Sequence, residues 1–211
     1  MPANRTYSSE NGLRSLPPHF HGFALMHIAM RRDAARLRAA APRWNGAGTP
    51  WWHHLRETIE WHHTSEDDVL WPALRHRDRD FDAQARELHD DHEELDAAMH
   101  AVTTAITHHG DGLVKAAAAF EDILRDHLRD EETIVFPVFD RLGERAYLAE
   151  ERKVVASAPM HVMTRLQPWM FDGATRQDLH HVRATIPPPV RLLGATVLQR
   201  RYTRTLKGIL T

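Results

Sequence analysis

The sequence predicts an all-α fold: an antiparallel, up-down-up-down four-helix bundle with a C-terminal helical extension. Apolar residues recur at every third or fourth position over long stretches, as they do along one face of a helix. The loops between these stretches are short and rich in glycine and proline, which makes consecutive helices antiparallel neighbours. No long segment alternates apolar and polar residues with the period of two that is typical of a half-buried strand.

Proline and glycine set the bounds of the predicted helices. The four helices of the bundle are expected over residues 18–41, 50–75, 81–106 and 112–143. Pro42 and Gly143 end the first and the fourth, since proline cannot continue a helix and glycine accepts the backbone conformation that follows one. Pro72 is expected to kink or end the second helix.

The bundle is expected to be flanked by two segments of different character. Residues 1–17 are polar and mixed in sequence, which predicts a flexible N-terminal segment. Residues 18–143 form the bundle, and residues 144–211 are predicted to be a helical extension that packs on it. The last part of the extension is basic, and we expect it to pack across the bundle rather than to contact a membrane or nucleic acid. Its basic residues are Arg200, Arg201, Arg204 and Lys207.

The composition excludes several classes of protein. The 27 Lys and Arg residues nearly balance the 29 Asp and Glu residues, so no attraction to nucleic acid or to an anionic membrane follows. Apolar runs such as residues 192–198 are far shorter than the roughly 20 residues of a membrane span. No apolar signal segment is present at the N-terminus, which predicts a cytoplasmic protein. The absence of cysteine excludes disulfides, thiolate metal sites and iron–sulfur clusters.

Histidine is abundant instead, and an internal repeat separates candidate ligands from the other histidines. The segments HHTSEDDVLWP (62–72) and HLRDEETIVFP (127–137) align without gaps and lie 65 residues apart. The same offset relates His27 in the first helix to His92 in the third. The chain therefore contains the pattern His…His-x3-Glu twice. Most of the other histidines among the 17 are interpreted as a solvated surface.

Helix geometry indicates that the repeated residues can meet. His27 lies about 20 Å from the end of its helix, and the second helix returns about 18 Å from Pro50 to His62, so the two histidines are level. Within a helix, His and Glu four residues apart share a face. One layer of the bundle should therefore contain four histidines and two glutamates: His27, His62, Glu66, His92, His127 and Glu131.

A metal centre is the simplest reason to bury this set, because buried ionisable groups are costly unless they are paired or coordinated. Imidazole and carboxylate ligands suit iron, manganese, zinc or copper. Six ligands are too many for one tetrahedral zinc ion but fit two metal ions. A lone His-x3-Glu on a helix is usually a surface pair, so the prediction depends on the repetition of the whole spacing.

The pattern resembles the haemerythrin-like proteins, also called HHE domains, whose signature is H…HxxxE…H…HxxxE. The resemblance covers residues 18–143. It implies an oxo- or hydroxo-bridged di-iron centre in which the four histidines are terminal ligands and Glu66 and Glu131 are bridges. Zinc or manganese is the expected substitute if iron is absent. The oxygen carriers of the family use five histidines, and this chain lacks the extra one unless His89, three residues before His92, turns inward.

Other residues near these positions are weaker candidates. His63, Asp67 and Glu132 are sequence neighbours of the predicted ligands and could be their hydrogen-bond partners or proton donors. Their rotation of about 100° from a ligand more often points to a helix interface or to solvent. The charged segment Arg31–Asp33 is interpreted as a solvated face. Four tryptophans are expected in the core: Trp51, Trp52, Trp61 and Trp71.

The favoured function is a di-iron protein that binds and reacts with O2, peroxide or NO, as an oxidase, an oxygenase or a peroxidase-like enzyme. The missing fifth histidine favours reaction over reversible transport of oxygen. The alternative is a non-enzymatic sensor or store of oxygen, NO or iron, and a structural zinc bundle is a third possibility. No nucleic acid and no membrane are expected as partners, and both a monomer and a homodimer are compatible with the sequence.

Overall fold

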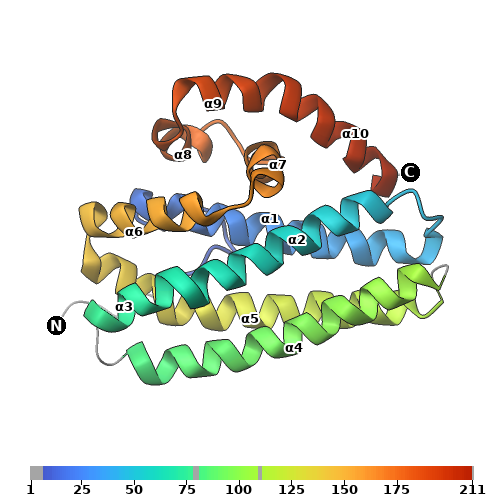
Figure 1. Ribbon diagram of the computed structural model, residues 1–211, viewed down its shortest axis with the longest axis horizontal. Helices are drawn as coiled ribbons and strands as arrows, with labels where there is room; N and C mark the ends of the chain where they lie inside the picture. Colours follow the sequence, from blue (N-terminus) through green and yellow to red (C-terminus); the bar gives the residue numbers. More distant parts are fainter. Residues whose placement is uncertain (1–6, 78–80, 109–110, 211) are drawn as a thin grey trace.

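The computed structural model describes residues 7–77, 81–108 and 111–210, and every regular element in this part of the chain is helical (Figure 1). The predicted all-α class is therefore confirmed. Within the described ranges, none of the helices is both long enough and apolar enough to cross a membrane.

Four long helical segments lie side by side in Figure 1. They are α1 (His21–Ala40), α2 (Thr49–Ser65) with its continuation α3 (Trp71–Arg77), α4 (Phe81–Thr107) and α5 (Leu113–Leu142). Short 3-10 turns flank α1 at Pro18–Phe20 and Ala41–Arg43. The central helix α5 contacts both α1 and α4, while α2 contacts α1 and α4. These bounds lie close to the four predicted helices, and residues 109 and 110 of the predicted loop at 108–112 lie outside the described residues.

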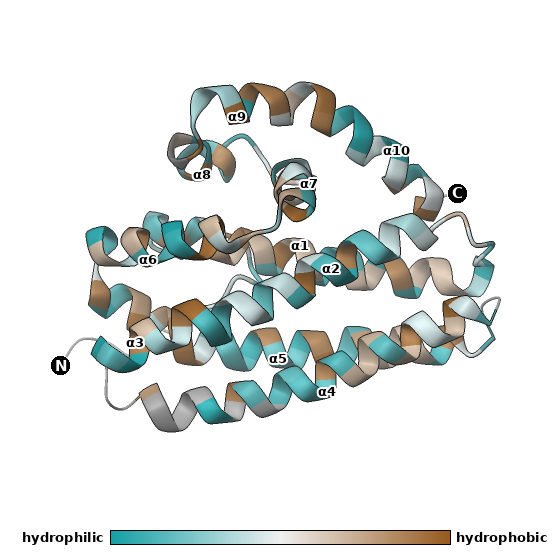
Figure 2. Cartoon of the chain, in the orientation of Figure 1, coloured by the Kyte–Doolittle hydropathy of each residue, from teal (hydrophilic) through white to brown (hydrophobic). Residues whose placement is uncertain are grey.

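The core of the bundle follows the spacing of the apolar residues. From Leu113 to Leu128 of α5 the buried apolar side chains recur every three or four residues and so form a single stripe on the helix. Figure 2 shows hydrophobic and hydrophilic residues following one another along this helix. The four predicted core tryptophans are confirmed, since none is more than 7% exposed. This stripe places the inward face of α5 at the centre of the bundle.

The two prolines of the internal repeat have different consequences. Pro137 lies inside the continuous helix α5, whereas Pro72 follows a π-helical turn, η3 (Glu66–Leu70), that joins α2 to α3. The turn closes with the N–H of Trp71 donating to the carbonyl of Glu66 five residues earlier. The predicted irregularity therefore begins at Glu66 rather than at Pro72. A π turn widens the helix locally and rotates the residues after it, a feature that is frequent at functional sites.

The N-terminal residues from Tyr7 onward pack against the bundle. Tyr7, Ser9 and Leu13 are buried, and the Tyr7 hydroxyl donates to Asp140 Oδ2 at 2.7 Å. Of the segment 1–17 that the sequence predicts to be flexible, residues 7–17 are thus held by specific contacts, while residues 1–6 lie outside the described residues.

The C-terminal extension folds back over α1 and α2 (Figure 1). Its elements are α6 (Glu144–Ser157), α7 (Met160–Phe171), α8 (Leu179–Thr185), α9 (Pro188–Leu193), a π-helical turn η4 (Gly194–Leu198) and α10 (Gln199–Leu210). The helix α10 approaches the loop before α2 so closely that a Cβ at Gly208 would overlap the Ala47 carbonyl. The basic segment therefore lies across the start of α2.

Asp33 anchors this extension, and the interpretation of Arg31–Asp33 as a solvated face was wrong. Asp33 is fully buried and its Oδ2 accepts a hydrogen bond from Trp169 Nε1 at 2.9 Å. Its Oδ1 accepts from Arg32 Nε at 2.8 Å and from Arg36 Nη1 at 2.9 Å. Asp33 is buried because the extension covers it, whereas Arg31 is buried where it donates to Ser9 of the N-terminal segment and to Glu132 of α5.

Replacing Asp33 with Ala should destabilise the protein by about 2–4 kcal/mol, because two guanidinium groups and a buried indole N–H would lose their shared acceptor. Urea unfolding checks the free energy, and limited proteolysis checks whether α7–α10 become accessible. The exposed Asp126, which pairs only with Arg129 among the described residues, provides the control variant Asp126→Ala. Equal stability of the two variants would contradict the anchoring role.

Candidate metal centre

The six residues predicted from the repeat come from every long segment of the bundle. His27 lies on α1, His62 on α2, Glu66 at the start of η3, His92 on α4, and His127 and Glu131 on α5. Each of them is at most 4% exposed. The structure therefore brings these ionisable side chains into the dry interior, where they are costly unless something compensates them.

The first of two clusters joins four of these residues. One ligand-type atom from each of His27, His62, Glu66 and Glu131 lies within 4.8 Å of the others. His62 Nε2 is 2.9 Å from Glu66 Oε1, and His27 Nε2 is 3.4 Å from Glu131 Oε2. Two imidazoles and two carboxyls thus converge on one point between α1, α2 and α5.

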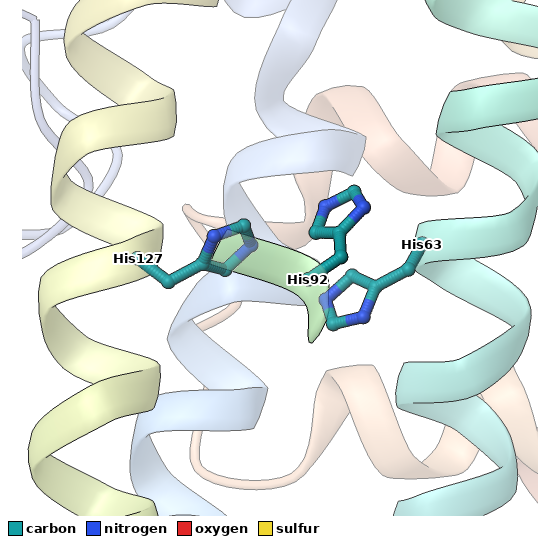
Figure 3. A group of neighbouring side chains, drawn as sticks. All are labelled: His63, His92 and His127. Atoms are coloured by element: carbon teal, nitrogen blue, oxygen red, sulfur yellow. The ribbon is translucent and has the colours of Figure 1, made fainter. Parts of the chain in front are cut away.

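The second cluster consists of three histidines: His63, His92 and His127. One imidazole nitrogen from each of the three lies within 4.8 Å of the other two, and all three side chains are buried. Figure 3 shows the three rings turned toward one another from α2, α4 and α5. The His63 and His92 rings stack at 4.2 Å between centroids, which is close contact for two side chains that both carry basic nitrogens.

The two glutamates connect the clusters. Glu66 directs Oε1 to His62 in the first cluster and Oε2 to His92 Nε2, 3.7 Å away, in the second. Glu131 Oε2 lies 3.4 Å from His27 Nε2 and 3.7 Å from His127 Nε2. Each carboxyl is therefore shared between the two clusters, which is the placement that a bridging carboxylate requires.

The free atoms of both clusters suit a cation. Most ligand-type atoms of the two clusters are buried without a hydrogen-bond partner. These are all four oxygens of the two glutamates, both nitrogens of His63 and His127, and Nε2 of His27, His62 and His92. Orphaned polar atoms of this kind are rare in folded proteins. Their convergence in two adjoining groups indicates that these residues fit metal ions as ligands.

Burial also sets the protonation states of these groups. Desolvation lowers the pKa of His27 to about 4 and that of His62 to about 3, so both imidazoles are neutral at physiological pH and keep a lone pair for a metal. Desolvation raises the pKa of Glu66 and of Glu131 well above the ordinary value, and for Glu131 the neighbouring Glu66 carboxyl adds to the effect. A cation between the carboxyls would favour their charged forms.

Two acidic residues hold histidines of the two clusters from behind. Glu132 Oε1 accepts a hydrogen bond from His27 Nδ1 at 2.9 Å and from Arg31 Nη1 at 2.7 Å. Burial opposes ionisation of Glu132, but these hydrogen bonds and charges prevail and lower its pKa to about 2. Asp67 Oδ2 accepts from His92 Nδ1 at 3.2 Å. In both histidines, Nε2 is thereby directed to the centre.

His63 is the central residue that the repeat does not predict. In the sequence it is only a neighbour of the predicted ligands, yet it completes the second cluster. His89, the alternative for an extra histidine, is largely exposed and forms another group with Asp67 and His92. A signal for His63 did exist: His63-x3-Asp67 overlaps His62-x3-Glu66, so two His-x3-acid pairs are interleaved in one segment.

Comparison with known proteins identifies one family. The protein-family model described as "Hemerythrin HHE cation binding domain" matches residues 20–139 of this chain, and this range contains both clusters. Neither the curated proteins nor the solved structures include a match to this chain.

Replacing His63 with Ala should remove a ligand of the second cluster and lower the stoichiometry or affinity of divalent-cation binding. Titration with Fe²⁺ or Co²⁺ and metal analysis provide the measurement. The exposed His100 on the outside of α4 gives the control His100→Ala. A loss of metal in His89→Ala but not in His63→Ala would show that the extra histidine was assigned to the wrong residue.

Glu132→Gln should weaken metal binding by roughly 10- to 100-fold, because the amide is a poorer acceptor for His27 Nδ1 and no longer balances Arg31. Competition with a coloured chelator measures the affinity. The matched control is Asp130→Asn, which changes an exposed acid two positions away. An affinity that Glu132→Gln leaves unchanged would rule out this orienting role.

Proposed function

The chain belongs to the hemerythrin HHE cation-binding domain family, a metal-binding helical family, and we propose that it holds two iron ions within an up-down-up-down four-helix bundle. In this proposal Glu66 and Glu131 bridge the two ions, His27 and His62 bind the first, and His63, His92 and His127 bind the second. The observation that carries the proposal is the pair of adjoining clusters with orphaned ligand atoms.

The donor set supports iron more than zinc. The site offers five imidazoles and two carboxyls, and the chain has no thiolate. This is more ligands than two tetrahedral zinc ions joined by bridging carboxylates need. Mixed imidazole and carboxylate ligands are common for iron, and manganese or zinc remains the expected substitute when iron is scarce. Bound iron would supply a redox-active site for O2, peroxide or NO.

The residues around the first cluster support an open position there. This cluster provides two histidines where the second provides three, so with both glutamates shared a metal near His27 and His62 would have fewer protein ligands. Phe23 packs on both of these histidines, with ring centroids 4.6 Å from His27 and 5.5 Å from His62. Its ring covers these two imidazoles and limits the access of water to them, which suits a small, weakly polar ligand.

Reaction with O2, peroxide or NO is the function we favour, and reversible binding is a second candidate with an observation of its own. The absence of a fifth histidine from the sequence pattern favours reaction. With His63 in the second cluster the centre has five imidazoles, the number used by the oxygen carriers of the family. His63 therefore supports a sensor, store or carrier role more strongly than the sequence suggested.

Glu66→Ala and Glu131→Ala should each reduce metal loading from two ions per chain to one or fewer, since either change removes a shared carboxyl. Metal analysis after reconstitution with Fe²⁺ measures the stoichiometry, with the exposed Asp68→Ala as control. Two ions retained in either glutamate variant would overturn the ligand assignment.

Mixing the reduced, iron-loaded protein first with O2 and then with peroxide separates the two functional candidates. Turnover or rapid autoxidation supports a redox enzyme, whereas a stable and reversible absorption change supports binding. Zinc as the bound metal after expression in iron-replete medium would favour a structural role instead.

A further inference from the structure

A second site lies between the C-terminal extension and the bundle, separate from the metal clusters. It is a cleft of about 960 Å³ lined by the first half of α2, by α7 and by α10. Figure 1 shows α10 descending to the start of α2 on this side of the molecule. None of the seven residues of the two metal clusters lines the cleft, so its chemistry does not belong to the metal centre.

The inner wall of the cleft is apolar and aromatic. Five apolar or aromatic side chains of the lining are each at most 9% exposed. They are Trp51 and Leu55 of α2, Trp169 of α7, and Leu198 and Tyr202 beside them. The polar atom of Trp169 is already used, because its Nε1 donates to Asp33. Such a wall suits the apolar body of a small molecule.

The rim of the cleft carries uncompensated positive charge. Arg201 and Arg204 of α10 line it, and neither has an acidic partner among the described residues. The two acids of the lining are already paired. Glu57 accepts a hydrogen bond from Arg165 Nη2 at 2.6 Å, and Asp33 is held by its own arginines and by Trp169.

The histidines of the lining do not offset this positive charge. His54 is half-buried, and its pKa falls to about 4 through burial and the nearby Arg165, so it is neutral and can either donate or accept a hydrogen bond. His161 faces the already paired Glu57, 3.9 Å away. Donors thus outnumber free acceptors around the opening.

We propose that this cleft binds a small organic anion, a carboxylate or phosphate monoester on an apolar or aromatic body. The headgroup would lie between Arg201 and Arg204, whose planar guanidinium groups match both anions through paired hydrogen bonds. The body would lie against Trp51, Leu55 and Trp169. The volume is in the range of pockets that hold small molecules, and binding requires no metal at the clusters.

The probes are benzoate and phenyl phosphate, with benzylamine as a cation of similar shape and benzyl alcohol as a neutral one. Calorimetric titration of the whole protein should give saturable binding of at least one of the anions, and much weaker binding of benzylamine and benzyl alcohol. A preference for phenyl phosphate or for benzoate distinguishes the two headgroups. Binding of neither anion, or equal binding of benzyl alcohol, would overturn the proposal.

Charge reversal tests the assignment of the rim. Arg201→Glu should weaken binding of the anion about tenfold or more, since it replaces a charge-assisted hydrogen bond with repulsion. Arg200→Glu is the matched control, because Arg200 is exposed on the same helix but does not line the cleft. Equal losses in the two variants would indicate only diffuse electrostatic attraction and would contradict the site.

Circular dichroism and metal content establish that the variants are folded. If Arg201→Glu disturbs the packing of α10, Arg204→Gln removes a charge at an exposed position and should still weaken binding severalfold. An unchanged affinity in a folded Arg204→Gln variant, together with an unchanged affinity in Arg201→Gln, would also refute the proposal.

Discussion

The structure depends on one constraint, which is the burial of five imidazoles and two carboxyls at the centre of an apolar bundle. Burial drives both kinds of group toward their neutral forms, lowering the pKa of the histidines and raising that of the glutamates. It also leaves at least one ring nitrogen of each histidine and both oxygens of each glutamate without a hydrogen-bond partner. A cation removes both costs, because it accepts the imidazole lone pairs and balances the carboxylates.

Helix α1 connects this centre to the segments on either side of the bundle. His27 is held by Glu132, which also accepts hydrogen bonds from Ser9 of the N-terminal segment and from Arg31, one turn along α1. Half a turn further, Asp33 anchors α7 of the extension. The N-terminal segment, the centre and the extension are therefore fixed to successive turns of one helix, and buried charge pairs rather than apolar contacts alone determine where they sit.

Helix α2 has a comparable double role. Its first half forms the apolar wall of the cleft with Trp51 and Leu55, and its end provides His62 and His63. These two adjacent residues serve different clusters because α2 passes between α1 and α4 and offers a face to each. The π turn that follows starts at Glu66, the carboxyl shared by both clusters, and Asp67 within the turn reaches His92.

The sequence by itself determined the helical class and six of the seven central residues, because helical periodicity and the 65-residue repeat encode which side chains are level and inward. It did not determine His63, since a residue rotated about 100° from His62 is inward only when a second partner helix lies on that side. Nor did it determine that Asp33 is buried, because its partner Trp169 is 136 residues away. Only the tertiary structure decided these points, because burial and pairing at such positions depend on which distant segment covers them.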